Sequence, residues 1–197
     1  APGGIRIVDT NNDGSLTPED RVALGTPYPD FTWGITNTFQ IKDFDISFLI
    51  QGVQGITVLN GDVYYNETKK WNKKYTKNRW VSAEHPGDGK TPYQNVKTGH
   101  DLMLTDYPLQ NASYACLRNF TVGYTLPATA ARKIKLSGVR FYVSGSNLLY
   151  IWGSGYKGIN PESRMTSGNY SSAMISGYQR GGFPLTSTIS AGFDINF

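Results

Sequence analysis

Apolar and polar residues alternate with a period of two in five segments of the chain, the pattern of β-strands that have two unlike faces. The last segment, 185–197, is the most regular, because apolar residues occupy every second position from Ile189 to Phe197. The other four segments are 31–41, 44–51, 114–126 and 139–151. The pattern predicts an all-β, antiparallel protein in which each strand presents one apolar face.

The segment 114–126 contains one departure from this alternation. We expect Tyr114 and Cys116 to share a face with Phe120, whereas Arg118 fits neither face. A residue out of phase within a strand indicates a bulge or the rim of a sheet. Cys116 is the only cysteine, so no disulfide forms within the chain and the strand ladder has to hold the fold together.

The connections between the five segments alternate between short and long. Lys42 and Asp43 alone join the first two segments, as in a tight β-hairpin, and the connection after Pro127 is also short. The other two connections, 55–111 and 152–183, are long. Outer-membrane β-barrels have short periplasmic turns and long extracellular loops, whereas structureless loops beyond about 15 residues are uncommon in a soluble domain. We therefore expect a transmembrane β-barrel with a periplasmic C-terminus and long extracellular loops.

The composition fits a barrel and excludes a membrane-spanning helix. The chain has 22 glycines and 13% aromatic residues, and its mean hydropathy is −0.39. No apolar run reaches the length of about 18 residues that a membrane helix needs. Barrel strands need only about 9–11 residues, and every second one faces a polar lumen, so their average hydropathy stays low. Five strands are fewer than the roughly eight of the smallest membrane barrels, so we expect a fragment of a larger barrel.

We divide the chain into two parts. Residues 1–29 are expected to form an extracellular loop, and residues 30–197 to form the last strands of the barrel with their loops. The stretch from Ala1 to Gly4 leads directly into strand-like sequence without a secretion signal. We therefore expect an exported parent protein to begin before this segment.

The formal net charge is +4, and a run of basic residues interleaved with aromatic residues spans 69–80. Such a run also occurs in nucleic-acid-binding proteins. Here it lies in a long connection between two predicted strands, where a solvated basic loop is the commoner outcome. We expect no nucleic-acid partner, and a loop that contacts ligand, a partner protein or lipopolysaccharide.

Residues 9–20 match the spacing of a calcium-binding loop. Oxygen-bearing side chains stand at the first, third and fifth positions, with a glycine at the sixth and a carboxylate at the twelfth, so hard oxygen ligands can surround a hard cation. Asp20 is shorter than the usual glutamate, which predicts weak affinity, and Pro18 argues against a two-helix calcium sensor. The alternative is a turn folded by its own Asp and Asn side chains. The candidate ligands of Ca²⁺ or Mg²⁺ are Asp9, Asn11, Asp13, Ser15 and Asp20.

No catalytic residue set emerges. His85 and His100 lie in a long connection, and neither has the spacing of a metalloprotease or hydrolase motif, so we expect no enzyme activity. Aromatic residues in the long connections are candidates for contact with ligand or with a partner protein, the alternative being that they brace their own loops. These candidates are Trp71, Tyr75, Trp80, Tyr93, Tyr156 and Tyr170.

Several stretches, taken in order, resemble the closing region of SusC/RagA-type TonB-linked outer-membrane proteins. The order of the stretches carries the resemblance, because each one alone would be weak. They are the Asp-rich loop ending in Glu19-Asp20-Arg21, LGTPYPDFTWG at 24–34, FDISFLIQG at 44–52, NRW at 78–80, YACLRNFTVGYTLP at 114–127 and VRFYVSGSNLL at 139–149. Together they cover nearly the whole chain.

The resemblance implies a large plugged barrel of about 22 strands in the bacterial outer membrane. It implies energised import of glycans or peptides, with a SusD-like surface lipoprotein as partner. It also implies an N-terminal plug and a TonB-contacting region outside this chain. Phe197 resembles the terminal aromatic residue by which outer-membrane proteins are recognised for barrel insertion.

Two other functions are compatible with parts of the sequence. One is a secreted calcium-dependent carbohydrate-binding β-sandwich, and the other is an outer-membrane enzyme that uses loop carboxylates. The apolar face of segment 185–197 favours the importer, because an edge strand of a sandwich is normally shorter and blunted by charge.

Overall fold

The structure is a computed structural model in which the chain divides into two compact units. The described residues are 2–63, 77–93, 104–153, 155–163, 177–180 and 182–197. The sheet unit comprises Pro29–Gly55, Ser113–Gly153 and Pro184–Phe197. The loop unit comprises Ala1–Tyr28, Ile56–Ala112 and Ser154–Phe183. The elements in chain order are η1 (Pro18–Asp20), β1 (Phe31–Ile41), β2 (Phe44–Gln54), β3 (Thr57–Asn60), β4 (Leu109–Asn111), β5 (Tyr114–Thr125), α3 (Ala128–Lys133), β6 (Gly138–Trp152), β7 (Tyr178–Gln179) and β8 (Thr188–Asn196).

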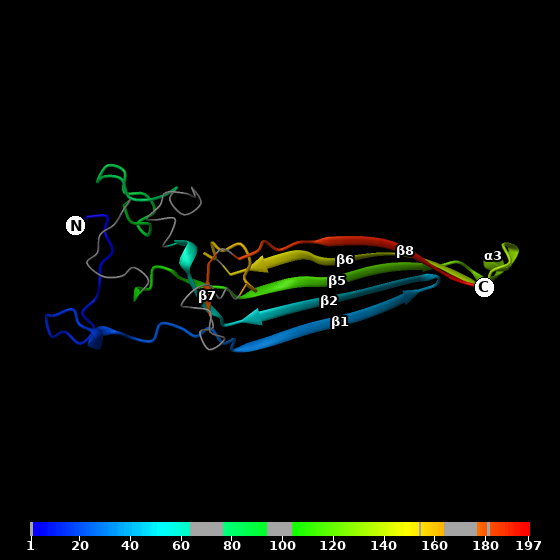
Figure 1. The fold of residues 1–197 in the computed structure, drawn as a ribbon, viewed down its shortest axis with the longest axis horizontal. Coiled ribbons are helices and arrows are strands. Elements are labelled where there is room, and N and C mark those ends of the chain that lie inside the picture. The colour runs from blue at the N-terminus through cyan, green and yellow to red at the C-terminus, as the bar shows by residue number, and fades with distance from the viewer. Residues whose placement is uncertain (1, 64–76, 94–103, 154, 164–176, 181) are drawn as a thin grey trace. The chain divides into compact units, whose positions relative to one another are not determined.

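The sheet unit is built on one antiparallel sheet of β1, β2, β5, β6 and β8, in that order (Figure 1). The prediction of an all-β antiparallel fold from the five alternating segments is confirmed. Strands β1 and β2 form the predicted hairpin, with Ile41 opposite Phe44 and only two residues between them. The first of these, Lys42, has φ 56°, and the tight two-residue hairpin turns require a positive φ at this position.

One face of this sheet is apolar and exposed. Cross-strand pairs such as Ile35 with Ile50 and Phe141 with Phe193 follow one another along this face. Ile35, Phe141 and Phe193 are 53%, 51% and 66% exposed. Contiguous exposed apolar patches of this kind mark surfaces that contact a protein partner or a membrane.

A bulge in β5 corrects the predicted faces of that strand. Arg118 is the extra residue, so that Leu117 pairs with Ile50 and Cys116 pairs with Gln51. Because side chains alternate with a period of two, one inserted residue moves everything before it to the opposite face. The prediction that Tyr114 and Cys116 share a face with Phe120 is therefore wrong.

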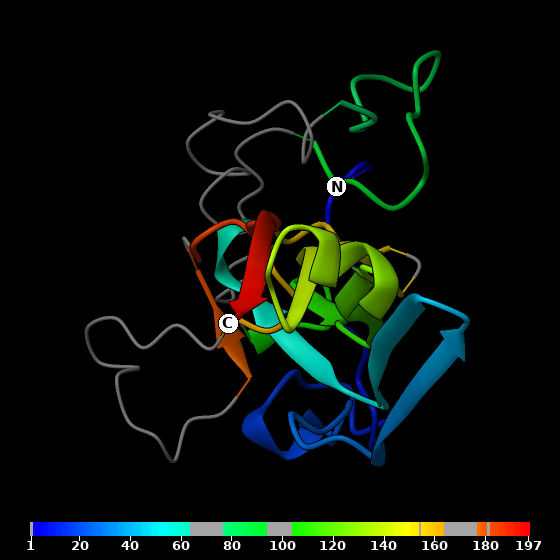
Figure 2. The same ribbon diagram turned by 90° about the vertical axis from the view of Figure 1, so that its right-hand side faces the viewer.

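The connection between β5 and β6 contains α3, which begins after Pro127. The carbonyl oxygen of Pro127 accepts hydrogen bonds from the N–H groups of Ala130 and Ala131 at 2.8 and 3.0 Å. Figure 2 views the sheet from the end that carries α3 and the C-terminus. None of the helices in the described residues is long and apolar enough to cross a membrane.

The loop unit has a small sheet and core of its own. Strand β3 pairs antiparallel with β4 and parallel with β7, so segments from both long connections meet in one sheet. Ile56, Val58 and Val63 are 2%, 0% and 2% exposed and form part of its core. The parts of the long connections around β3, β4 and β7 are therefore packed structure rather than extended loop.

Candidate functional sites

The Asp-rich segment 9–20 folds around its own side chains. The N–H groups of Gly14, Asp13 and Ser15 donate to Asp9 Oδ2, Asn11 Oδ1 and Asp13 Oδ1 at 2.8, 3.0 and 2.7 Å. Gly14, with φ 82°, makes the sharp bend that the sixth position of a calcium loop also needs. The structure thus places Asp9, Asn11, Asp13 and Ser15 in one tight loop that is held by its own hydrogen bonds.

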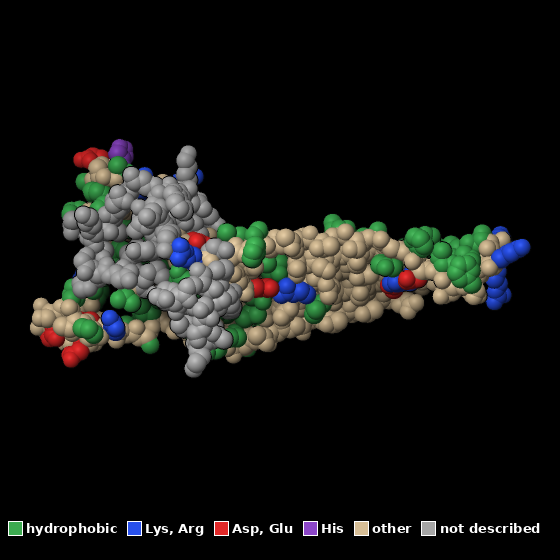
Figure 3. Space-filling view, in the orientation of Figure 1, with side chains coloured by type: hydrophobic (Ala, Val, Ile, Leu, Met, Phe, Trp, Pro, Cys, Tyr) green, Lys and Arg blue, Asp and Glu red, His purple; other side chains and the backbone are tan. Residues whose placement is uncertain are grey.

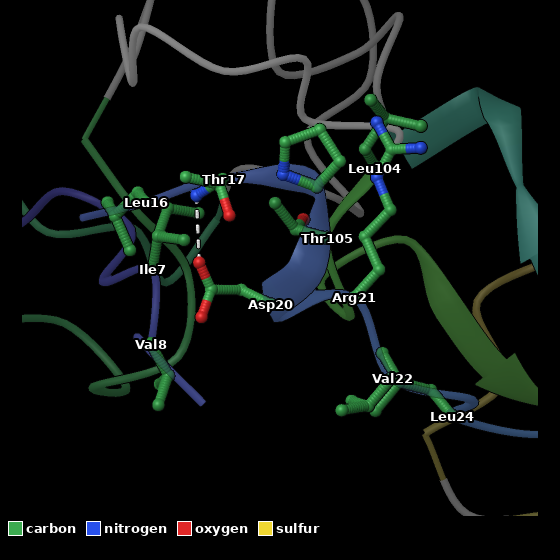
Figure 4. Close-up of a pocket in the computed structure, with 11 residues that line it drawn as sticks. Ile7, Val8, Leu16, Thr17, Asp20, Arg21, Val22, Leu24, Leu104 and Thr105 are labelled. Atoms are coloured by element: carbon green, nitrogen blue, oxygen red, sulfur yellow. Dashed lines mark hydrogen bonds between the residues drawn. The ribbon is translucent and has the colours of Figure 1, made fainter. Parts of the chain in front are cut away.

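Asp20 closes this loop and fixes the short helix η1 beside it. Asp20 Oδ2 accepts the N–H of Thr17 at 2.8 Å (Figure 4), and Oδ1 accepts the N–H of Thr10 at 2.8 Å. Thr17 Oγ1 in turn accepts the N–H of Glu19 at 3.3 Å, which completes a capping box. The hydrogen bonds from the backbone of Thr17 and Thr10 lower the pKa of Asp20 below its usual value. The carboxylate is therefore ionised at neutral pH.

The same loop shows both a feature that suits a cation and one that does not. Asp9 Oδ1 is a buried acceptor without a hydrogen-bond partner, and a cation would satisfy it. However, Asp20 Oδ1 already accepts hydrogen bonds from the N–H groups of Thr10 and Asn11, so only Oδ2, which accepts the N–H of Thr17, keeps a lone pair for a metal. Within the described parts of the chain, no three His, Cys, Asp or Glu side chains already stand together as a metal site.

The candidate aromatic residues occupy different environments. The rings of Trp80 and Tyr93 lie 6.3 Å apart with an edge-to-face tilt of 67°. Tyr156 is 6% exposed, and its hydroxyl donates to Gln179 Oε1 at 2.7 Å, so this residue braces the loop unit. Three of the candidates, Trp71, Tyr75 and Tyr170, lie outside the described residues. Phe197 follows β8 and is 94% exposed.

The polar face of the large sheet carries an ion pair that the sequence analysis did not identify. Arg140 of β6 donates to both carboxylate oxygens of Asp45 of β2, with Nε–Oδ1 and Nη2–Oδ2 distances of 3.0 and 2.6 Å. The two side chains reach across Gly123 of β5, where a Cβ would lie 2.5 Å from Arg140 Nη2. Arg140 also contacts Asp194 at 3.4 Å. Figure 3 shows blue (Lys, Arg) and red (Asp, Glu) side chains in contact on the face of the sheet that it presents.

A second polar cluster surrounds the β5 bulge. Arg118 Nη1 donates to Asn147 Oδ1 and to the Tyr150 hydroxyl at 2.9 Å each, and Arg118 Nε donates to Gln51 Oε1 at 3.2 Å. Asn147 has φ 55°, which marks an irregularity in β6 opposite the bulge. The irregular phase of Arg118 in the sequence was the only local signal of this cluster.

The loop unit also has an apolar groove beside the Asp-rich loop, with a volume of about 390 Å³ (Figure 4). Figure 4 shows Ile7, Val8 and Leu16 on one side of η1 and Val22 and Leu24 beyond it. Sequence reasoning did not identify this groove, because its walls come from positions that show no regular period.

Comparisons with known proteins confirm the resemblance stated from the sequence. No family model matches the chain. The chain is 30% identical over 203 residues to TonB-dependent receptor P3 of Formosa agariphila, covering 100% of this chain and 19% of that receptor. It is 27% identical over 157 residues to TonB-dependent receptor SusC of Bacteroides thetaiotaomicron, covering 79% of this chain and 15% of SusC. The chain is thus homologous to a segment of TonB-dependent receptors and spans 19% and 15% of the length of these two relatives.

Solved structures show the same fold. The RagAB peptide importer in its 'closed-closed' state matches 93% of this chain and 19% of the compared chain, with a TM-score of 0.70 and 20% identity. The structure of the RagAB peptide transporter matches 88% of this chain with a TM-score of 0.67 and 21% identity. The five-stranded sheet with its connections is therefore a fragment of this barrel fold.

Proposed function

We propose that the parent protein of this segment of a TonB-dependent receptor is an energised outer-membrane importer, and that the segment forms part of its barrel wall. The observation that carries this proposal is the exposed apolar face of the five-stranded sheet. The outer edges of β1 and β8 have no strand partner among the described residues. Unpaired backbone groups are too costly in lipid, so further strands of the parent chain must continue the sheet.

The strand order supports an assignment of the two membrane sides. The hairpin turn at Lys42 and the connection with α3 leave one end of the sheet, whereas both long connections leave the other end. Short turns face the periplasm in outer-membrane barrels and long loops face the outside. The C-terminus is then periplasmic, and the segments of the loop unit, including residues 1–28, are extracellular.

The proposed cargo and partners follow from the relatives. One relative is SusC, and the structural neighbour RagAB is a peptide importer. We propose glycans or peptides as cargo, a SusD-like surface lipoprotein as the extracellular partner, and TonB as the energy source through a region outside this chain. Trp80 and Tyr93 are partly exposed in the loop unit and are available to contact cargo or partner.

The Asp-rich loop is proposed to bind Ca²⁺, with Mg²⁺ as the alternative ion. Asp9, Asn11, Asp13 and Asp20 would supply side-chain oxygens, and Ser15 its carbonyl group. The buried, unsatisfied Asp9 Oδ1 supports this proposal. The ion would hold the loop closed and would take no part in transport chemistry.

A secreted β-sandwich is the competing function, and it needs a second layer over the apolar face. The exposure of Ile35, Phe141 and Phe193 argues against such a layer within the described residues. The test is to fractionate cells that produce the native parent protein and to measure TonB-dependent uptake by the same cells. We expect extraction only by detergent, together with a lipoprotein, and uptake that is lost without TonB. A soluble chain of 21.8 kDa would contradict the proposal.

A further inference from the structure

Three segments of the loop unit meet at a cavity of about 410 Å³, which we call the Trp80 cleft. This volume lies in the range of about 300–1,000 Å³ that is typical of small-ligand sites. The polar and aromatic side chains in its lining are Arg6, Trp80, Lys90, Thr91, Asp106 and Tyr107. An aromatic surface with a few convergent polar groups is the usual composition of such a site.

The wall of the cleft that carries Lys90 is held by Asp88. Asp88 Oδ1 accepts the N–H groups of Lys90 and Thr91 at 2.8 and 2.7 Å, and Oδ2 accepts the Thr91 hydroxyl at 2.9 Å. The N–H of Trp80 donates to the carbonyl oxygen of Thr91 at 3.0 Å. A wall fixed in this way needs little ordering when a ligand binds, which favours affinity.

The indole of Trp80 is positioned by two neighbours. Gly3, with φ 76°, packs so closely that a Cβ there would lie 2.5 Å from Trp80 Cε3, and only glycine suits this contact. Tyr93 meets the indole edge to face, and its N–H donates to the carbonyl oxygen of Gly3 at 2.9 Å. The indole is therefore held in one orientation while it lines the cleft.

The charges of the cleft favour an anionic ligand that also carries hydroxyl groups. Arg6 and Lys90 are exposed cations, and none of the ion pairs among the described residues includes them. A guanidinium group suits a carboxylate or sulfate, because it donates two parallel hydrogen bonds. Asp106 would repel a second carboxylate but accepts a hydrogen bond from a sugar hydroxyl. This combination favours a saccharide over an acidic peptide.

We propose that the Trp80 cleft binds one unit of an anionic saccharide. The sugar ring lies on Trp80, its carboxylate or sulfate group contacts Arg6 and Lys90, and a ring hydroxyl donates to Asp106. This inference deepens the proposed import function, because it names the class of cargo that the extracellular side of the importer captures.

The test uses the full-length receptor in detergent and isothermal titration with three probes of similar length: tetragalacturonate, maltotetraose and tetraglutamate. We expect tetragalacturonate to bind at least about tenfold more tightly than either other probe, a difference of about 1.4 kcal/mol. Trp80→Ala is expected to weaken this binding about tenfold or more, and Trp80→Phe to retain most of it. Arg6→Gln and Lys90→Gln are each expected to weaken it about three- to tenfold and to reduce its salt dependence, because one of the two cations remains.

The matched control is Lys133→Gln, which removes one positive charge from α3, outside the cleft. Each variant is first checked for the heat-dependent shift in gel mobility of a folded barrel. If tetraglutamate bound as tightly as tetragalacturonate, the cleft would be assigned to acidic peptides. If maltotetraose bound as tightly, the negative charge of the ligand would have no role in binding. Binding that Trp80→Ala leaves unchanged would place the ligand elsewhere. If uptake depends on TonB but wild type does not bind tetragalacturonate, this inference alone fails and the importer function stands.

Discussion

An arginine placed at different heights on the apolar face should report the depth of each position in the membrane. Val143 of β6 is 52% exposed and lies on this face between Val122 and Ala191. Val143 is the sixth residue of the 15-residue strand. At about 3.3 Å per residue and a strand tilt of about 40°, it lies roughly 13 Å above the periplasmic end of β6. This is close to the middle of an apolar band that is about 25 Å tall.

The expected cost follows from this position. Val143→Arg should lower the free energy of unfolding by about 2–4 kcal/mol, the cost of an arginine at the bilayer midplane. Ile151 lies on the same face of β6, eight residues further along. It is about 20 Å higher by the same geometry, so Ile151→Arg should cost only about 0–1 kcal/mol. The neighbouring Ser144 lies on the polar face, and Ser144→Arg serves as the matched control.

The measurement is urea unfolding of the full-length receptor refolded into lipid vesicles, followed by tryptophan fluorescence. The order of destabilisation should be Val143→Arg first, then Ile151→Arg, with Ser144→Arg close to wild type. A soluble sandwich would bury Val143 and Ile151 alike and would show no dependence on depth. Equal costs at Val143 and Ser144 would refute the assignment of the apolar face to lipid.

Three further predictions concern the ion pair and the Asp-rich loop. Gly123→Ala should cost about 0.5–1 kcal/mol in the same unfolding assay, because its Cβ would push the ends of Asp45 and Arg140 apart and break their part-exposed ion pair. Gly34→Ala, where nothing lies closer than 3.8 Å, is the control, and equal effects would contradict this account. Because hydrogen bonds lower the pKa of Asp20 from 3.8, its contribution to loop stability is present above pH 3.8 and is lost as pH falls below that value. Pepsin cleavage near residues 9–21, normalised at each pH to cleavage of an unfolded substrate, should therefore rise more steeply at low pH in wild type than in Asp20→Asn, which keeps the titrating carboxylates of Asp9 and Asp13. Equal slopes would disprove the role of Asp20. Ca²⁺ should raise the melting temperature of chelator-treated receptor and bind at least about tenfold more weakly to Asp9→Asn; an unchanged melting temperature would leave the loop as a hydrogen-bonded turn.

Many of the side chains that form the candidate sites could not be grouped from local sequence alone. The spacing of residues 9–20 identified a loop whose side chains do fold together, and Trp80 was a candidate from its place in a long connection. The cleft around Trp80 was not predictable, because Arg6, Lys90 and Asp106 come from three separate segments. The ion-pair partner of Arg140 could not be predicted from the sequence either, because Asp45 is 95 residues away and contacts Arg140 only across Gly123.

The sequence by itself determined the strands of the large sheet, because alternation of apolar and polar residues is a local pattern that each strand carries alone. It also determined the hairpin at Lys42, where two residues leave room for only a tight turn. Tertiary structure decided the register, which placed Cys116 opposite Gln51 once the bulge at Arg118 was inserted. Tertiary structure also decided the small sheet of β3, β4 and β7, because strands this short are fixed by their neighbours rather than by their own periodicity.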